Sequence, residues 1–206
     1  MSNFRYTRPD AFPPIVKNLI IINVLVFIAQ NMFDKEYRIT ELFALYPLGT
    51  GEFKPYQIAT HMFTHGSIAH IFFNMFGLWM FGRVLENVWG PKRFLLFYLV
   101  CGVGAAATHL FVEYVTGGYS AAIGASGAVM GIFAAFAYLF PNTELYIMLI
   151  PIPVKAKWAV LGMAALDIFG SVSGNTGIAH FAHLGGALTG FILVLIWNKT
   201  NKKRFY

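Results

Sequence analysis

Charged residues are scarce in this chain. Asp, Glu, Lys and Arg together make up 12% of its 206 residues, while hydrophobic residues make up 57%. A typical soluble domain has about 25% charged and about 45–50% apolar residues, so this composition argues against a soluble globule. The apolar segments follow one another without a polar linker. We therefore predict one all-α polytopic membrane domain over residues 1–206.

Cysteine and acidic residues are also few. The single cysteine, Cys101, lies in an apolar stretch, which excludes a disulfide framework within the chain and a cysteine-rich metal site. Nine acidic residues stand against fifteen basic ones, which gives a net charge of +6. A nucleic-acid partner would need basic residues clustered on one surface, whereas here they lie between apolar segments. We predict the lipid bilayer as a partner, and no nucleic acid.

Six apolar segments are candidates for transmembrane helices, each judged against the roughly 20 residues that cross a hydrocarbon core of about 30 Å. They cover about residues 15–33, 68–88, 94–115, 126–140, 158–169 and 178–197. An earlier start of the fifth, in the apolar run 145–153, is an alternative. The first is too long for the apolar region of a typical signal peptide and no cleavage motif follows it, so we expect it to stay as a membrane anchor.

The basic residues predict the orientation of these spans, because short cytoplasmic loops carry an excess of Lys and Arg. Most lie before the first span, around the second connection, in the fourth connection or after the last span: Arg5, Arg8, Lys17, Arg83, Lys92, Arg93, Lys155, Lys157, Lys199, Lys202, Lys203 and Arg204. Both termini should therefore be cytoplasmic. The long first loop, residues 34–67, contains aromatic residues and prolines, which predicts a folded element at the membrane interface.

Four polar residues inside the predicted spans stand out, because polar groups at membrane depth are costly and usually face a bundle interior or a cavity. His70 and Asn74 are four residues apart and so lie on one face of the second helix. Ser126 starts the fourth span, and His183 lies early in the sixth. For the first pair alone, hydrogen bonding between helices is an equally good interpretation.

Ser126 lies in the sequence Gly124-Ala125-Ser126-Gly127. At the start of a helix, free backbone N–H groups and the helix dipole favour a developing negative charge, which suits an oxyanion. Taken alone, the motif favours helix packing instead, since Gly, Ala and Ser are the usual residues of membrane helix contacts.

Two glycine faces connect the serine with the histidine. Gly186 and Gly190 follow His183 on one helical face, and Gly127 and Gly131 repeat the spacing on the fourth helix. Glycines at this spacing let two helices approach closely. If the two faces pack, the serine hydroxyl and the imidazole come within hydrogen-bond reach, which is the arrangement that a nucleophile and its general base need.

The other histidines leave two alternatives. His180 lies three residues before His183 and competes with it as the base, or else caps the end of the helix. His61, His65 and His70 would be the ligands of a zinc site, but no carboxylate or cysteine is placed to complete the ligand shell. We predict no metal and no cofactor.

Together these residues resemble the rhomboid intramembrane serine proteases: His70-xxx-Asn74 in the second span, Gly-Ala-Ser-Gly around Ser126 opening the fourth, and Ala182-His183 with its following glycines in the sixth. The resemblance covers nearly the whole chain. It implies a rhomboid-like bundle of six transmembrane helices that hydrolyses peptide bonds in or near the transmembrane segments of single-span membrane proteins. It also implies a bacterial cytoplasmic membrane as the location.

The resemblance assigns roles to the polar residues. Ser126 would be the nucleophile, and His183 would be the general base and then the acid. His70, Asn74 and the backbone N–H of Ser126 would form the oxyanion hole. The family needs no third carboxylate, so neither Glu113 nor Asp167, the acidic residues nearest the outer face, is expected to orient His183.

Two positions depart from the family pattern. Tyr56-Gln57 stands in the first loop where many relatives have Trp-Arg, and Met130 stands where some relatives stack an aromatic residue on the histidine. A thioether also packs against an imidazole, so we expect activity.

Hydrolysis needs a water-filled cavity that leads to the serine. From their positions in the sequence, we predict that Ser120, His65 and Thr64 line this cavity.

Three other functions compete with the protease. A catalytically dead relative that binds membrane proteins would have lost the serine or the histidine, and this chain has both. A small transporter would show inverted repeats or interrupted helices, and the sequence shows none. A hydrolase of lipid acyl esters would use the same Ser126 and His183 chemistry and differs only in substrate.

Overall fold

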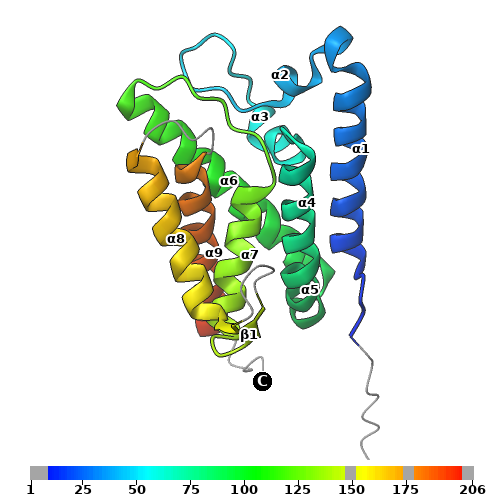
Figure 1. Cartoon of the computed structure of the whole chain (residues 1–206), viewed down its shortest axis with the longest axis vertical. Coiled ribbons are helices and arrows are strands. Elements are labelled where there is room, and N and C mark those ends of the chain that lie inside the picture. The colour runs from blue at the N-terminus through cyan, green and yellow to red at the C-terminus, as the bar shows by residue number, and fades with distance from the viewer. Residues whose placement is uncertain (1–8, 147–151, 174–178, 201–206) are drawn as a thin grey trace, which may run out of the picture.

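The computed structural model describes residues 9–146, 152–173 and 179–200. Its helices form six columns that run alternately up and down (Figure 1): α1 (Pro14–Tyr37), α4 (Ile68–Gly77) continued by the π-helical turn η2 (Leu78–Gly82) and α5 (Arg83–Trp89), α6 (Pro91–Thr116), α7 (Ser126–Leu139), α8 (Ala156–Ser173) and α9 (His180–Thr200). Two short antiparallel strands, β1 (Glu144–Leu145) and β2 (Val154–Lys155), lie in the connection between α7 and α8.

Four of these columns are long and apolar enough to cross a membrane, namely α1, Ile68–Trp89, α6 and α9. Large apolar side chains on their outer faces are exposed, among them Leu25, Phe72, Phe111 and Leu188. Soluble monomers rarely expose so much continuous apolar surface. The chain is thus an all-α polytopic membrane protein, and the number of six crossings stays a prediction.

Some of the predicted features lie outside the described residues. In the spans, these are the predicted start of the sixth at Ile178 and the centre of the apolar run 145–153. Outside the spans, they are the basic residues near the two ends of the chain, Arg5, Arg8, Lys202, Lys203 and Arg204. The first described residue of α1 and the last of α9 lie at the same end of the bundle (Figure 1).

The first helix ends later than its apolar segment. Apolar residues stop at Phe33, but α1 continues to Tyr37 and ends where Arg38 takes a left-handed conformation, with φ 50° and ψ 44°. The Arg38 N–H donates to the carbonyl of Asp34 at 2.8 Å, which is a common way to satisfy the carbonyls at a helix end. Hydropathy does not detect such a cap, and for this reason the predicted span ends at Phe33 although the helix continues to Tyr37.

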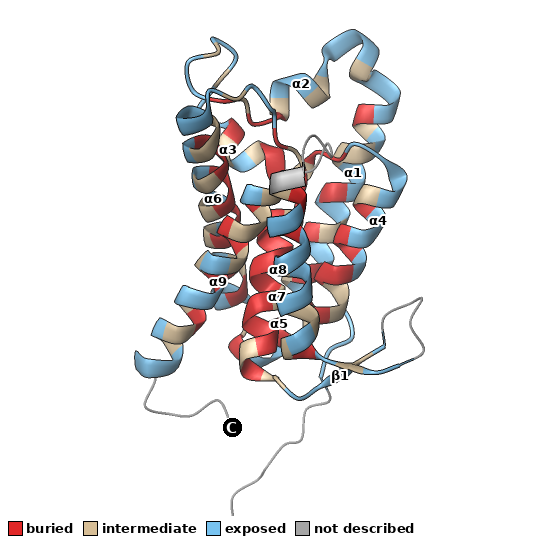
Figure 2. Cartoon of the chain, turned by 60° about the vertical axis from the view of Figure 1, so that its left-hand side comes forward, coloured by how far each residue is buried: buried red, intermediate tan, exposed pale blue. Residues whose placement is uncertain are grey.

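Helix α7 forms the centre of the bundle, and Figure 2 shows it almost entirely buried. Its glycines meet those of α9: a Cβ added to Gly190 would lie 2.6 Å from the backbone of Gly131, and one added to Gly186 would overlap the carbonyl of Gly127. The two faces with glycines four residues apart therefore lie in backbone contact, a distance that only small residues permit.

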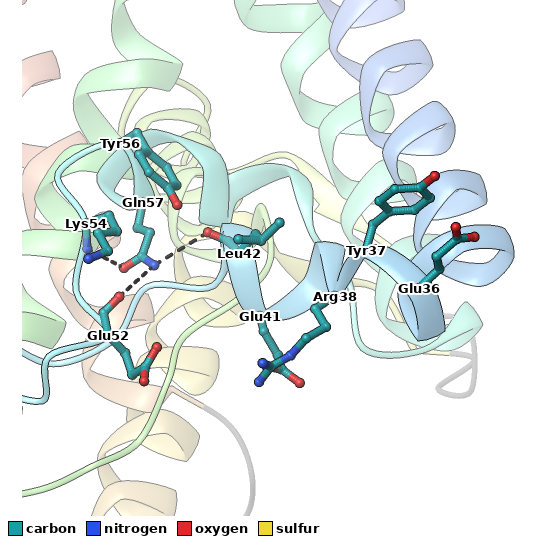
Figure 3. A pocket seen from close by; sticks show the side chains of 9 residues that line it. All are labelled: Glu36, Tyr37, Arg38, Glu41, Leu42, Glu52, Lys54, Tyr56 and Gln57. Atoms are coloured by element: carbon teal, nitrogen blue, oxygen red, sulfur yellow. Dashed lines mark hydrogen bonds and ion pairs between the residues drawn. The ribbon is translucent and has the colours of Figure 1, made fainter.

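The first loop is folded in the structure and contains α2 (Ile39–Phe43), α3 (Gln57–Thr60) and the 3-10 turn η1 (His61–Phe63). The buried amide of Gln57 holds it together (Figure 3). Its Nε2 donates to the carbonyls of Glu52 (3.1 Å) and Leu42 (3.5 Å), and its Oε1 accepts from the N–H of Lys54 at 3.0 Å. The residue that stands in place of a family arginine is therefore an internal brace of this loop.

A buried carboxylate anchors the other end of α1. Glu86 on α5 is 2% exposed and accepts from the N–H groups of Ile15 (2.9 Å) and Val16 (2.8 Å). These N–H groups belong to the first turn of α1, where backbone N–H groups have no acceptor within the helix and where the positive end of the helix dipole lies. Glu86 therefore ties α1 to the column of α4 and α5.

We expect Glu86→Ala to lower the free energy of unfolding by about 2–3 kcal/mol, because it leaves two buried donors without an acceptor. Unfolding in mixed detergent micelles measures this change. Glu144→Ala, which removes an exposed carboxylate from β1, is the matched control and should change stability by less than about 0.5 kcal/mol. Equal losses in both variants would contradict the anchoring role.

Candidate active site

The segment that leads into α7 is held by the first loop. Leu45 and Ala122 exchange two backbone hydrogen bonds of 2.9 Å, and the N–H of Gly124 donates to the carbonyl of His61 at 2.8 Å. Gly124 has φ +113°, and a Cβ there would lie 2.7 Å from the ring of His70. Glycine is thus required at this position both by the backbone and by the neighbouring imidazole.

Ser126 follows as the first residue of α7. The first backbone hydrogen bond of the helix runs from the N–H of Val129 to the carbonyl of Ala125 at 3.0 Å. The N–H groups of Ser126, Gly127 and Ala128 therefore precede the helical ladder, as the first turn of any helix requires. The serine thus lies in the turn of the helix whose N–H groups are not used by the helix itself.

The serine and the histidine meet across α7 and α9. Nε2 of His183 lies 2.7 Å from Oγ of Ser126. The contact follows from the glycine faces described above, because the approach of the two backbones brings the first turn of α9 against the first turn of α7. The predicted pair is therefore brought together in the structure.

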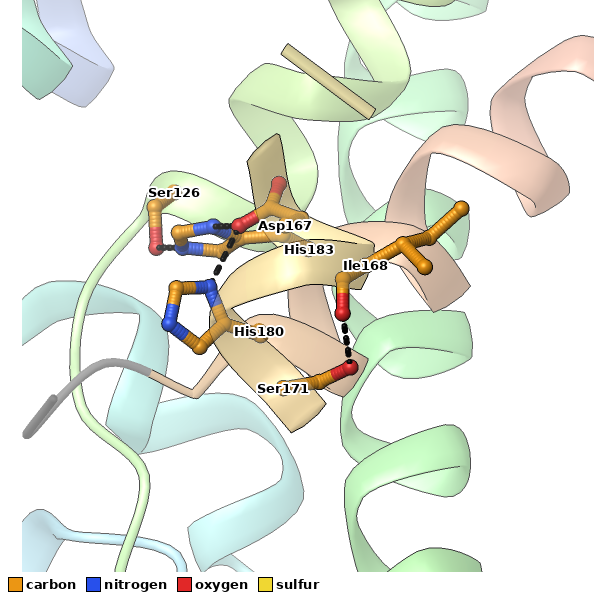
Figure 4. Close-up of polar contacts among 6 residues, drawn as sticks. All are labelled: Ser126, Asp167, Ile168, Ser171, His180 and His183. Carbon is orange, nitrogen blue, oxygen red and sulfur yellow. Dashed lines mark hydrogen bonds and ion pairs between the residues drawn. The ribbon is translucent and has the colours of Figure 1, made fainter. Parts of the chain in front are cut away.

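A carboxylate completes this cluster, which the sequence interpretation did not expect. Oδ1 of Asp167, on α8, lies 3.0 Å from Nδ1 of His183 and 2.8 Å from Nδ1 of His180 (Figure 4). The expectation that Asp167 does not orient His183 is thus wrong in its geometry, and His180 binds the same carboxylate and does not merely cap its helix. The spacing of three between the two histidines was the signal available, but which face of α8 they meet depends on packing.

His70 and Asn74 border the same site from α4. The Nδ2 of Asn74 is buried and has no hydrogen-bond partner among the residues that the structure describes. A Cβ added to Gly124 would lie 3.6 Å from this nitrogen, so the amide faces the segment that precedes the serine. Buried donors are rarely left without an acceptor, and an unused donor beside Ser126 is suited to a substrate oxygen.

Two cavities meet at the pair. One, of about 340 Å³, is lined by Gly66, His70, residues 121–123, Ser126, Ala179 and His183. The other, of about 290 Å³, is lined by Asn74, Ser126, Asp167, His183 and apolar side chains that include Met130, Met163 and Phe133. Met130 and His183 thus line the same apolar cavity.

The cavities are not lined by the residues that we predicted. His65 is 2% and Thr64 is 0% exposed, and neither lines either of the two cavities described above. Ser120 does not line them either, and its carbonyl lies 3.0 Å from Nε2 of His109. In the first loop, burial lowers the pKa of His61 and of His65 to about 4. Both imidazoles are therefore neutral at pH 7.

The zinc alternative finds no ligand set. Within the described ranges, no three His, Cys, Asp or Glu side chains are grouped so that they could hold a metal ion. Nδ1 of His61 lies 2.9 Å from the carbonyl of Gln57, and the rings of His65 and His70 stack edge to face with centroids 5.0 Å apart. These histidines support the loop and the wall of the site.

The arrangement can activate a serine. An imidazole nitrogen faces the hydroxyl, the other imidazole nitrogen faces a carboxylate, and backbone and amide donors lie nearby. This is the set of groups used for nucleophilic attack on a carbonyl carbon, recognised by geometry on many unrelated folds.

Comparison with known proteins identifies a family for the chain. A family model described as the Rhomboid domain matches residues 52–199. The mitochondrial presenilin-associated rhomboid-like protein of Homo sapiens is 32% identical over 188 residues, which cover 88% of this chain and 49% of that protein. The mitochondrial RHOMBOID-like protein 12 of Arabidopsis thaliana is 29% identical over 212 residues, covering 93% and 60%.

A third relative is the mitochondrial Rhomboid protein 1 of Saccharomyces cerevisiae, 29% identical over 132 residues, which cover 63% of this chain and 38% of that protein. The chain spans about half the length of the human relative. The names of all three place them in mitochondria, so they lend no support to the expectation of a bacterial cytoplasmic membrane.

Proposed function

Because the chain belongs to the rhomboid family, we propose that it is an intramembrane serine endopeptidase that cleaves single-span membrane proteins in or near their transmembrane segments. The observation that supports this most is the 2.7 Å distance between Oγ of Ser126 and Nε2 of His183. The substrate segment must unwind to be cut, because a hydrogen-bonded helix does not offer its peptide carbonyls to a nucleophile.

In the proposed reaction, His183 removes the proton from Ser126 as Oγ attacks the carbonyl carbon of the scissile bond. The negative charge on the carbonyl oxygen is stabilised by the N–H of Ser126, the amide of Asn74 and the imidazole of His70. His183 then delivers its proton to the leaving amine, and an acyl-enzyme remains on Oγ. Water, activated by His183, hydrolyses this ester.

The two cavities fit the two demands of this reaction. The apolar cavity of about 290 Å³ between α4, α7 and α8 suits the side chains of a transmembrane segment. The cavity of about 340 Å³ reaches the same serine from the side of the loops, which is the side from which water must come. The substrate for acylation and the water for hydrolysis of the acyl-enzyme would thus reach the serine through different cavities.

Labelling with a fluorophosphonate tests this proposal. The detergent-purified protein is incubated with the probe, and the labelled peptide is identified by mass spectrometry. We expect modification of Ser126 that disappears in His183→Ala. Absence of labelling, while a reference membrane serine protease reacts in the same detergent, would favour a binding protein without catalytic activity.

Asn74 should contribute to the rate and not to substrate binding. We expect Asn74→Ala to lower kcat by about 10²-fold with little change in KM, because an oxyanion donor acts mainly in the transition state. Asn31→Ala, which removes an exposed amide from α1 that donates to Phe27, should leave kcat unchanged. A loss that appears in KM alone would contradict the oxyanion role.

The membrane that holds the protein is a separate proposal. We place it in a bacterial cytoplasmic membrane with both termini cytoplasmic, and the mitochondrial relatives make a mitochondrial membrane the competing location. Detection of the protein in fractionated membranes of its source cells decides between them.

A further inference from the structure

We propose that Asp167 is a positioning residue for His183, so that the proposed protease works with three aligned groups, Ser126, His183 and Asp167, from three different helices. This inference rests on the proposed function of Ser126 and His183. It goes beyond that function because a serine and a histidine alone suffice for the reaction described above.

The first argument concerns the tautomer of the histidine. A carboxylate can only accept hydrogen bonds, so the 3.0 Å contact between Oδ1 of Asp167 and Nδ1 of His183 requires the proton on Nδ1. The lone pair of Nε2 then faces the hydroxyl of Ser126 at 2.7 Å. A general base must present this form, and without an acceptor at Nδ1 the imidazole would be free to take the other one.

The second argument concerns the cost of the carboxylate. Asp167 is 8% exposed, on a helix whose neighbouring side chains, such as Leu166 and Ile168, point outward and are more than half exposed. A carboxylate at this depth is costly unless it is paired. Two imidazoles at 2.8 and 3.0 Å supply the pairing, which fixes the carboxylate at His183 instead of leaving it to the solvent.

The third argument concerns the fit between the two helices. Asp167 and Gly170 are three residues apart on α8 and both are buried, and His180 and His183 are three residues apart on α9. A Cβ added to Gly170 would lie 2.5 Å from the ring of His180. The glycine therefore admits this ring against α8, where its Nδ1 reaches the same carboxylate oxygen that His183 contacts.

One consequence is that the site depends on the position of α8. The nucleophile comes from α7, the base from α9 and the carboxylate from α8 (Figure 4). Asp167 also lines the apolar cavity beside Ser126. A substrate segment that moves α8 would therefore change the alignment of His183.

The test compares Asp167→Asn with wild type by the rate of fluorophosphonate labelling at Ser126, by kcat and KM on a transmembrane substrate, and by the unfolding midpoint. We expect labelling and kcat to fall together by about 10- to 100-fold, less than the loss of about 10⁴-fold seen when a triad aspartate is replaced in proteases that depend on it. KM and the unfolding midpoint should stay close to wild type. Glu144→Gln, on the exposed strand β1, is the control and should change none of these.

A merely structural carboxylate would lower the unfolding midpoint and leave the labelling rate of the folded protein unchanged, and this result would overturn the inference. Where Asp167→Asn does not fold, Asp167→Glu keeps the charge and lengthens the side chain by one methylene. A positioning role predicts slower labelling in that variant at normal stability, and a wild-type rate would overturn it. Failure of the unsubstituted protein to label at Ser126 would instead overturn the proposed function, and the role of Asp167 with it.

Discussion

Replacement of Ser126 by alanine is expected to abolish cleavage of a transmembrane substrate while the protein remains folded. In the proposed mechanism this hydroxyl forms the acyl-enzyme. Among the described hydrogen bonds its Oγ makes a single polar contact, with Nε2 of His183. Loss of the nucleophile in serine proteases lowers kcat by about 10⁶-fold. Cleavage of a reporter with one transmembrane helix, followed by gel electrophoresis, measures the effect.

His183→Ala should lower cleavage by a similar factor, because a nucleophile and its base act as one unit and their losses do not add. The double variant should therefore be no less active than either single variant. Ser171→Ala is a suitable control, since this hydroxyl donates only to the carbonyl of Ile168 one turn earlier in α8 (Figure 4). Retained cleavage in both Ser126→Ala and His183→Ala would defeat the proposed mechanism.

The second large effect is expected at Gly186. A methyl group at this position would overlap the backbone carbonyl of Gly127, and backbone cannot rotate away as a side chain can. We expect Gly186→Ala to lower the free energy of unfolding by about 3 kcal/mol or more, at the upper end of the range for overpacking. The folded fraction of Gly186→Ala should also cleave substrate about 10²-fold more slowly than wild type, because α9 and its imidazole must move away from Ser126.

Gly162→Ala is the matched control for this prediction. Gly162 is an exposed glycine in the interior of α8, and nothing lies within 4 Å of a Cβ added there. Since alanine is the better helix former, this change should raise stability by up to about 1 kcal/mol. If both variants unfold at the wild-type midpoint, the contact between α7 and α9 is looser than the structure indicates.

Much of the bundle can be predicted from the sequence, because its helices are defined by hydropathy and its closest contacts by glycine. The column of α4, η2 and α5 and the helices α6 and α7 begin and end within a few residues of their apolar runs. The spacing of Gly127 and Gly131 against Gly186 and Gly190 leads directly to the contact between Ser126 and His183. Both the apolar runs and the glycine spacing can be recognised within a short stretch of sequence, and each reflects a single physical requirement.

The contacts that could not be predicted depend on packing between distant segments. Asp167 was visible as an acidic residue in an apolar helix, but its partner depends on the rotation of α8 against α9. The amide of Gln57 and the carboxylate of Glu86 bind backbone groups. Because every residue has a backbone, such contacts require no particular residue type at the partner position and cannot be recognised in the sequence. The burial of His65, whose two ring nitrogens have no hydrogen-bond partner within the described part of the chain, likewise depends on packing in three dimensions.

The length of α7 sets the depth at which chemistry takes place. Its 14 residues rise about 21 Å, less than the hydrocarbon thickness of about 30 Å. With its C-terminal end at one boundary of that layer, the helix begins about 9 Å short of the other. The serine at its first position would then lie below the surface of the lipid layer. For the proposed protease this depth means that both the peptide bond to be cut and the water that hydrolysis consumes have to enter the lipid layer.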